Sequence, residues 1–212
     1  MGFTKPIMSL TLVAIASAAF AEDKVGSEDG FLDVRIGYTI ADTEYERRDN
    51  ISDETVEEDW DNVHRPWVLL MYSPGLDPHG WLFGVDVTAD FRDVNSEDDD
   101  VDVEYEAYSA HLHVGYGVVL GNHFQLEFVP FFGAGIAKIE GVDAEDEPTV
   151  LEYGANVNGI VLFDRFMIGA QIGYLLSDTD EEFRDNVDTT EDQTYDWQSG
   201  SLTFSGFLGI RF

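Results

Sequence analysis

Apolar and polar residues alternate with a period of two along most of the chain from residue 31 onward. This period is typical of β-strands whose two faces meet different surroundings, whereas an amphipathic helix repeats every 3.6 residues. Turn-forming residues and acidic stretches divide the pattern into eight predicted strands. These strands cover residues 31–40, 66–73, 80–92, 101–120, 123–140, 150–163, 166–177 and 200–212.

Six of these strands carry one face without any charged, amide or histidine side chain. In the last strand this face comprises Leu202, Phe204, Gly206, Leu208, Ile210 and Phe212. The opposite face is polar and rich in glycine. In a soluble barrel the apolar face would form the core, whereas in a transmembrane barrel it meets lipid and the polar face fills a narrow lumen. The transmembrane arrangement is favoured, because a face exposed to water would be unusually rich in glycine.

The predicted connections alternate between short and long. Short links at residues 74–79, 121–122 and 164–165 alternate with long ones at 41–65, 93–100, 141–149 and 178–199. Outer-membrane barrels have this asymmetry, with short periplasmic turns and long external loops, and their closed sheet leaves no unpaired edge in the bilayer. We therefore predict an all-β fold over residues 30–212, an eight-stranded antiparallel up-and-down transmembrane β-barrel with long acidic external loops.

Three places depart from simple alternation. The strand at 66–73 is apolar on both faces. The strand at 101–120 changes phase between Tyr105 and Tyr108, which predicts a β-bulge. Pro130 lacks the N–H that a closed sheet requires, so we expect a second bulge there, which would reverse the inward and outward faces beyond it.

The first 21 residues have the features of a cleaved export signal. Lys5 gives a basic start, an apolar stretch follows at residues 7–20, and Ala19-Phe20-Ala21 matches the cleavage pattern of small residues. The apolar stretch is short for a membrane-spanning anchor helix. These features predict a bacterial outer-membrane protein with a signal peptide at 1–21 and a lead-in at 22–29.

The last strand ends in alternating apolar residues and a final Phe212. With the eight-strand pattern, this ending resembles the small outer-membrane β-barrel family of the OmpA transmembrane-domain and OmpX type. The resemblance implies that Phe212 is part of the signal for the barrel-assembly machinery. It also implies lipid and lipopolysaccharide as surroundings and a monomer as the oligomeric state. It does not indicate an activity, because a fold does not fix a function.

Two histidines are the first candidates for chemistry. His111 and His113 lie two residues apart on one predicted strand. We expect both to face the lumen together with Ser109, and the neighbouring strand to bring Asp86 close. A Ser/His/Asp hydrolase and a metal site are both possible with this set. The sequence has no nucleophile motif, and a lipid-processing site would have to open to the bilayer. We therefore predict no catalytic residues and interpret the histidines as hydrogen-bonded members of a polar lumen.

Charged residues on the inward face form the second candidate set. An eight-stranded barrel is just wide enough for side chains to fill it, and buried charges must pair. We expect Arg211 to lie beside Asp33 where the first and last strands meet, and Arg35 to reach Glu127 across the lumen. The predicted luminal network therefore comprises Asp33, Arg35, Asp86, His111, His113, Glu127, Glu152 and Arg211. Structural plugging is favoured, and a selectivity filter or gate is the alternative.

Composition limits the function further. The formal net charge is −32, and 33 of the 43 acidic residues fall in segments 41–65, 90–106, 140–147 and 178–196. Such a charge excludes a general nucleic-acid binder, and the absence of cysteine excludes disulfides and Cys-ligated metals. The densest acidic cluster comprises Glu97, Asp98, Asp99, Asp100 and Asp102. It lacks the spacing of an EF-hand, so we expect loosely bound divalent cations, no specific metal site and no cofactor.

These features lead to a non-enzymatic hypothesis: an integral outer-membrane barrel with a structural or surface-interaction role in the cell envelope. A narrow porin-like channel for ions or small solutes is the first alternative. A lipid A-modifying outer-membrane enzyme is the second.

Overall fold

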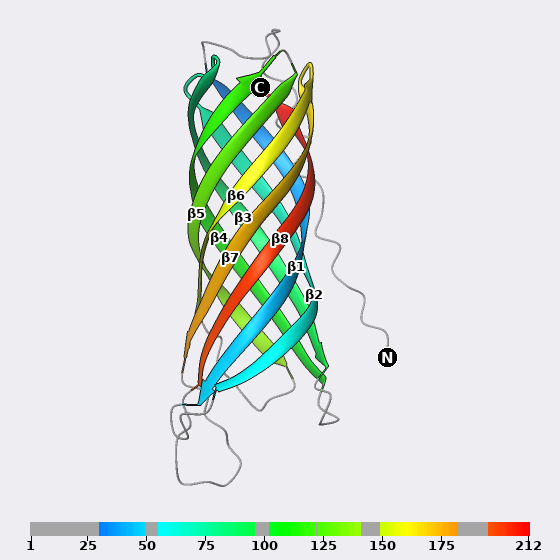
Figure 1. Ribbon diagram of the computed structural model, residues 1–212, viewed down its shortest axis with the longest axis vertical. Coiled ribbons are helices and arrows are strands. Elements are labelled where there is room, and N and C mark those ends of the chain that lie inside the picture. Colours follow the sequence, from blue (N-terminus) through cyan, green and yellow to red (C-terminus); the bar gives the residue numbers. More distant parts are fainter. Residues whose placement is uncertain (1–29, 50–54, 96–101, 122, 141–148, 182–194) are drawn as a thin grey trace.

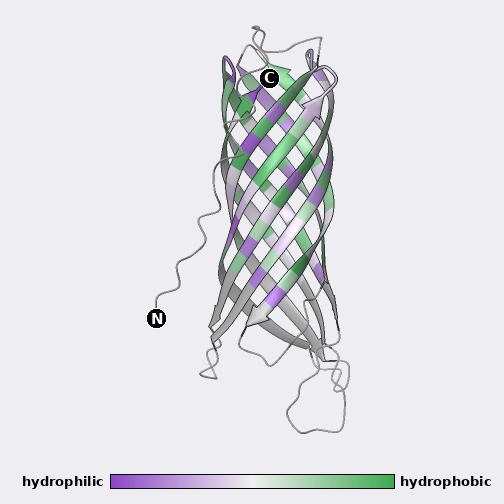
Figure 2. Cartoon of the chain, turned by 180° about the vertical axis from the view of Figure 1, so that it is seen from behind, coloured by the Kyte–Doolittle hydropathy of each residue, from purple (hydrophilic) through white to green (hydrophobic). Residues whose placement is uncertain are grey.

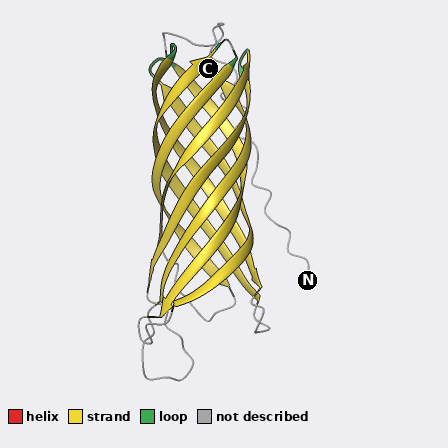
Figure 3. Ribbon diagram, in the orientation of Figure 1, coloured by secondary structure: helices red, strands yellow, loops and turns green. Residues whose placement is uncertain are grey.

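The computed structural model describes residues 30–49, 55–95, 102–121, 123–140, 149–181 and 195–212, which form one closed antiparallel barrel (Figures 1 and 3). Each strand pairs with the next, and β1 closes the barrel against β8, so the predicted fold class is confirmed. The strands are β1 (Phe31–Asp49), β2 (Thr55–Ser73), β3 (His79–Asn95), β4 (Asp102–Leu120), β5 (Phe124–Glu140), β6 (Thr149–Phe163), β7 (Phe166–Glu181) and β8 (Tyr195–Arg211). No helix among the described residues is long and apolar enough to cross a membrane.

Several strands are much longer than the sequence pattern predicts. The predicted loop at 41–65 contains the second half of β1 and the first half of β2, which stay paired as far as Arg48 and Thr55. The prediction of a long loop there is wrong. Hydrophobic alternation marks only the part of a strand that separates an apolar from a polar surrounding, whereas backbone pairing continues after that difference ends.

The apolar face points outward. Leu208 of β8 is 64% exposed and Phe128 of β5 is 54% exposed, whereas Glu127, which precedes Phe128 and points inward, is 2% exposed. Green and purple segments accordingly alternate along the strands in Figure 2. Apolar side chains on the outside and charges on the inside reverse the arrangement of a soluble barrel.

Both predicted bulges are absent. β5 keeps one register against β6 through the pair Pro130↔Ala155, and Ile136 beyond it still faces outward. Against β4, the pairs stop at His113↔Phe131 and resume in the same register at Tyr116↔Phe128. The missing N–H of Pro130 therefore costs local pairing without inserting a residue.

The β3–β4 register is also constant, so the phase change at Tyr105 lies in the composition of β4 and not in its backbone. A register shift occurs elsewhere, between Ala41 and Thr43 of β1, which pair with Val63 and Trp60 of β2. No change of sequence pattern marks this shift, because it lies where the alternation has already faded.

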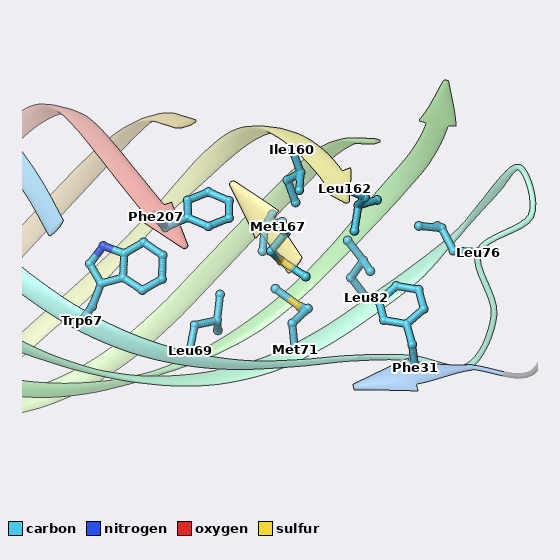
Figure 4. Packing of buried hydrophobic residues seen from close by; sticks show 11 residues of the cluster. Phe31, Trp67, Leu69, Met71, Leu76, Leu82, Ile160, Leu162, Met167 and Phe207 are labelled. Atoms are coloured by element: carbon cyan, nitrogen blue, oxygen red, sulfur yellow. The ribbon is translucent and has the colours of Figure 1, made fainter. Parts of the chain in front are cut away.

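The apolar inner face of β2 forms part of a cluster inside the barrel (Figure 4). We call this set the apolar cluster, and its buried members are Phe31, Trp67, Leu69, Met71, Leu76, Leu82, Val129, Ile160, Leu162, Met167 and Phe207. Leu76 comes from the turn between β2 and β3 and is completely buried. The lumen is therefore polar only in part, because apolar side chains occupy much of the half nearer the short turns.

Glycines on the inner face make room for the largest members of this cluster. A Cβ atom on Gly37 would lie 2.1 Å from the Trp67 ring, and one on Gly169 would lie 2.1 Å from the Phe207 ring. The two aromatic rings pack against each other with centroids 5.7 Å apart. The glycine content of the inner face thus follows from the bulk that the narrow lumen must hold.

Among the described residues, β2 and β3 share the shortest pairing of any two neighbouring strands. β2 and β3 pair from Tyr72↔Phe83 to Trp67↔Thr88, and then at His64↔Phe91. The gap between these stretches falls at Pro66, which has no N–H to donate. Beyond His64 no β2–β3 pair occurs among the described residues of the two strands.

Candidate luminal site

Four charged side chains near the short turns form what we call the turn-end cluster: Asp33, Arg35, Glu127 and Arg211. Arg35 donates from Nη1 to Glu127 Oε2 at 2.6 Å and from Nη2 to Glu127 Oε1 at 2.7 Å. The same Nη2 donates to Asp33 Oδ2 at 2.8 Å. Arg211 donates from Nε and Nη2 to the two oxygens of Asp33 at 2.8 and 2.9 Å.

The topology explains this arrangement. Asp33 and Arg211 are register partners on β1 and β8, so their side chains meet along one wall. Glu127 projects from β5 on the opposite side of the lumen and reaches Arg35 directly. Bidentate pairs between guanidinium and carboxylate are the strongest type of ion pair in proteins. Two cations and two anions are thus matched where water is excluded.

Neutral side chains complete the turn-end cluster. Gln125 donates to Glu127 Oε1 at 2.6 Å and accepts from Arg211 Nη2 at 3.0 Å. Asn158 donates to Glu127 Oε2 at 2.9 Å. The Arg211 guanidinium also lies 3.6 Å from the centroid of the Phe31 ring, which links the charged cluster to the apolar one.

A second group of charged side chains, the loop-side cluster, comprises Arg65, Asp86, His111, His113 and Glu152. His111 contacts Asp86 Oδ1 through Nδ1 at 2.5 Å and Glu152 Oε2 through Nε2 at 2.9 Å. Arg65 donates to both oxygens of Glu152 at 2.8 and 3.0 Å. His113 Nε2 contacts Asp86 Oδ2 at 2.8 Å. The eight residues of the predicted network therefore lie inside the barrel, divided between two clusters.

The loop-side cluster does not have the geometry of a Ser/His/Asp hydrolase. Both nitrogens of His111 contact carboxylates, so neither is available to take a proton from Ser109. Ser109 is itself buried on the inner face of β4. The Ser/His/Asp hypothesis therefore has no nucleophile–base pair among the described hydrogen bonds.

Metal binding has no geometric basis in the part of the chain that the structure describes. There, no group of three or more His, Cys, Asp or Glu side chains is arranged to hold an ion. The acidic residues Glu97, Asp98, Asp99 and Asp100 lie outside the described residues, as does the side chain of Asp102. The predicted signal peptide and lead-in, residues 1–29, also lie outside them.

Sequence reasoning missed Arg65 as a member of the network. Arg65 lies in the predicted loop 41–65, but in the structure it is an inward residue of β2 with the same parity as Trp67. It contacts Glu152 and lies 3.5 Å from Asp90 of β3. Extending the alternation of β2 backwards by one residue would have revealed it.

Between the loop-side cluster and the apolar cluster lies a cavity of about 50 Å³. Its lining includes Asp86, His113, Asn158, Trp67 and Phe131. A water molecule needs roughly 10–15 Å³ of such space, so this cavity holds only a few small molecules. It is far too small for a lipid or a peptide.

No known protein family and no curated protein sequence matches the chain. Several solved structures do match the chain. Neisserial surface protein A is 12% identical over 89% of this chain and 100% of its own, with a TM-score of 0.52. The outer membrane protease OmpT of Escherichia coli is 9% identical over 90% and 99%, with a TM-score of 0.50. The fold is that of an outer-membrane β-barrel. Ail of Yersinia pestis, crystallised with a heparin analogue, is 16% identical over 87% and 99%, with a TM-score of 0.47.

Proposed function

We propose that this outer-membrane-type barrel is an integral, non-enzymatic protein of the bacterial outer membrane, sealed across its lumen, with a structural or surface-interaction role in the envelope. The short turns then face the periplasm, and the end with the acidic segments faces outward. We place it with the OmpA and OmpX type of small barrel, on the basis of its strand pattern and the alternating apolar residues of β8. Lipid and lipopolysaccharide are its proposed surroundings, and the barrel-assembly machinery its proposed partner during insertion.

Outward apolar side chains of all eight strands form what we call the apolar belt, which includes Ile36, Val68, Val85, Leu112, Phe128, Val157, Ile172 and Phe204. This belt supports membrane insertion. Near the short turns, Trp81 packs edge-on against Tyr116 with ring centroids 5.6 Å apart, and the Tyr116 hydroxyl contacts His79 Nδ1 at 2.6 Å. Aromatic residues that combine an apolar body with a polar tip are typical of the membrane–water interface.

The opposite rim of the belt has matching features. Phe91 packs edge-on against Tyr108. The next outward residue of β4 beyond Tyr108, toward the long connections, is Glu106. It lies opposite Lys138 of β5, so the outer surface becomes charged there. Between the two rims the outward side chains are apolar, as a hydrocarbon surrounding requires.

The packing of side chains across the lumen is the observation that favours a structural role over a role as a channel. The ion pairs of the turn-end cluster cross the lumen where Arg35 and Glu127 are fully buried. The apolar cluster occupies much of the same half of the barrel, and Leu76 of the adjoining turn is completely buried there. A conducting path would have to break paired buried charges or hydrate packed apolar side chains, and both are costly.

The absence of an enzymatic role is likewise a proposal, supported by the site. The His111 nitrogens are engaged by carboxylates, and the cavity beside them admits only small molecules. Neither feature suits the binding and cleavage of a lipid or a peptide.

Tryptophan fluorescence tests the proposed membrane location. Two variants keep a single tryptophan, either Trp81 on the outer surface or Trp67 inside the barrel, with the other three tryptophans replaced by phenylalanine. In vesicles of brominated phospholipid, Trp81 should be strongly quenched and Trp67 should be protected, since their exposed fractions are 57% and 8%. Equal quenching of both, or quenching of neither, would overturn the proposal.

A further inference from the structure

His111 contacts a carboxylate with each of its two ring nitrogens. Nδ1 lies 2.5 Å from Asp86 Oδ1, and Nε2 lies 2.9 Å from Glu152 Oε2. An ionised carboxylate only accepts hydrogen bonds, so each nitrogen needs a hydrogen of its own to make its contact. A neutral imidazole carries one N–H, whereas an imidazolium carries two. The two contacts therefore require either the imidazolium form of His111 or a proton on one of the carboxylates.

The register of the strands explains how one ring reaches both acids. Asp86 and His111 are register partners on β3 and β4, and Gly133 of β5 and Glu152 of β6 continue the same row. Gly133 has no side chain, and a Cβ atom there would lie 2.3 Å from Cδ2 of His111. The imidazole therefore lies over this glycine and crosses β5 to reach Glu152. One ring in this way connects four consecutive strands.

His113, two residues further along β4, does not need a second proton for its contacts. Its Nε2 lies 2.8 Å from Asp86 Oδ2, whereas its Nδ1 has no hydrogen-bond partner among the described residues. A neutral ring with its hydrogen on Nε2 satisfies this arrangement. The hydrogen bonds of the loop-side cluster thus require an additional proton at His111 and not at His113.

Charged and titratable side chains surround His111 from four strands: Arg65 of β2, Asp86 and Asp90 of β3, His113 of β4 and Glu152 of β6. β5 contributes the Phe131 ring, whose centroid lies 5.4 Å from that of His111. Three carboxylates thus share one permanent cation, which favours a further positive charge among them. Glu152 already accepts two hydrogen bonds from Arg65, and imidazole is more basic than a carboxylate. The additional proton therefore belongs on the ring.

We propose that His111 is a proton-dependent brace of the loop-side half of the lumen. As an imidazolium it donates to Asp86 and Glu152 at once and holds β3 to β6 together. When the ring loses one proton at higher pH, one nitrogen presents a lone pair to a carboxylate, and that contact becomes repulsive. The turn-end cluster has no such dependence, because its cations Arg35 and Arg211 stay protonated. Alkaline conditions therefore loosen one half of the lumen and leave the other half closed.

Nuclear magnetic resonance of the unmodified protein in micelles tests the proposed protonation state. With ¹⁵N-labelled histidine, correlations through the carbon-bound ring protons report on both nitrogens of each ring. At pH 8, where a histidine exposed to water is neutral, we expect one ring with both nitrogens protonated and with nuclear Overhauser contacts to Phe131. This signal should persist in His113→Phe. Single protonation of every ring beside Phe131, or loss of the signal in His113→Phe, would overturn the proposal.

The pH dependence of unfolding tests the role of the brace. Where the folded barrel keeps a proton that the unfolded chain has released, stability falls as pH rises, and the unfolding equilibrium constant increases by up to tenfold per pH unit. Denaturant unfolding in micelles between pH 7 and pH 9 compares the unmodified protein with His111→Gln, which cannot hold this proton. The ratio of their unfolding constants, unmodified to variant, should increase with pH.

His79→Gln is the matched control. His79 lies on the outer surface beside Tyr116, so this variant should keep the pH dependence of the unmodified protein. A ratio of unfolding constants that stays constant with pH for His111→Gln, or changes equally for the two variants, would contradict the brace. If His111→Gln does not fold, the resonance experiment decides alone. Either failure leaves the sealed lumen of the proposed function intact, because the turn-end cluster does not involve His111.

Discussion

Arg35 of β1 and Glu127 of β5 join opposite sides of the barrel through two hydrogen bonds of 2.6 and 2.7 Å, and both side chains are completely buried. One residue pair spans the lumen because eight strands enclose a space just wide enough for side chains. The pair is therefore placed to affect both the stability of the barrel and the passage of solutes through it.

Removing one member of this pair should be costly. Arg35→Met leaves Glu127 buried with only the donors of Gln125 and Asn158, and should lower the free energy of unfolding by about 3–5 kcal/mol. Denaturant unfolding in micelles measures it. The double variant Arg35→Met/Glu127→Met is the control and should be more stable than Arg35→Met alone, since no charge of the pair is stranded. A single variant as stable as the unmodified protein would show that the pair is dispensable.

The glycine opposite Trp67 offers a test of packing in the lumen. Gly37→Ala places a methyl group within the Trp67 ring and should destabilise the barrel by about 1–3 kcal/mol. Gly206→Ala is the matched control, because a Cβ there meets nothing within 4 Å. If the two alanine variants unfold at the same denaturant concentration, the inner face is more loosely packed than the structure indicates.

His111 should be the residue of the loop-side cluster that tolerates substitution least. His111→Phe removes one partner from Asp86, which keeps His113, and one from Glu152, which keeps Arg65. It should cost about 3 kcal/mol or more, because each lost hydrogen bond to a charged group is worth about 1.5–3 kcal/mol. His79→Phe, at the outer rim beside Tyr116, should cost about 1 kcal/mol, the usual value of one hydrogen bond. Urea unfolding of the two variants side by side gives the comparison. A smaller loss for His111 than for His79 would contradict the assigned network.

The loss of stability caused by a charge on the outer surface should depend on how deep in the membrane the charge lies. Leu112, on the outer face of β4, is 64% exposed, and Leu112→Arg should destabilise the barrel in lipid vesicles by about 2–4 kcal/mol. Thr149→Arg, at the first residue of β6 on the loop side, should cost about 0–1 kcal/mol. Equal costs at the two positions would mean that the belt does not face hydrocarbon.

The barrel could be predicted from the sequence because its two faces meet such different surroundings. Alternation identified the strands and assigned Asp33, Arg35 and Glu127 to the inner face, and strand order then placed Arg211 beside Asp33. Alternation gives no signal where both faces of a strand carry residues of the same kind. The sequence of the second half of β1 is polar at nearly every position, so the pattern could not show that it continues as a strand.

Other features depend on contacts that no periodicity encodes. Leu76 lies in a turn, and only the three-dimensional path of that turn carries it into the barrel. The apolar inner face of β2 signalled an exception, but its partners come from other strands far along the chain. The predicted bulge at Pro130 was wrong because a proline in the ladder can lose local pairing without a change of register.

Single-channel recording of the refolded, unmodified protein in a planar lipid bilayer is the most direct test of a sealed lumen. Buried ion pairs and the apolar cluster predict no steady conductance, and Arg35→Ala combined with Trp67→Ala should open a small one by removing parts of both barriers. Steady, large single-channel currents from the unmodified protein would contradict the sealed lumen and make the barrel a channel.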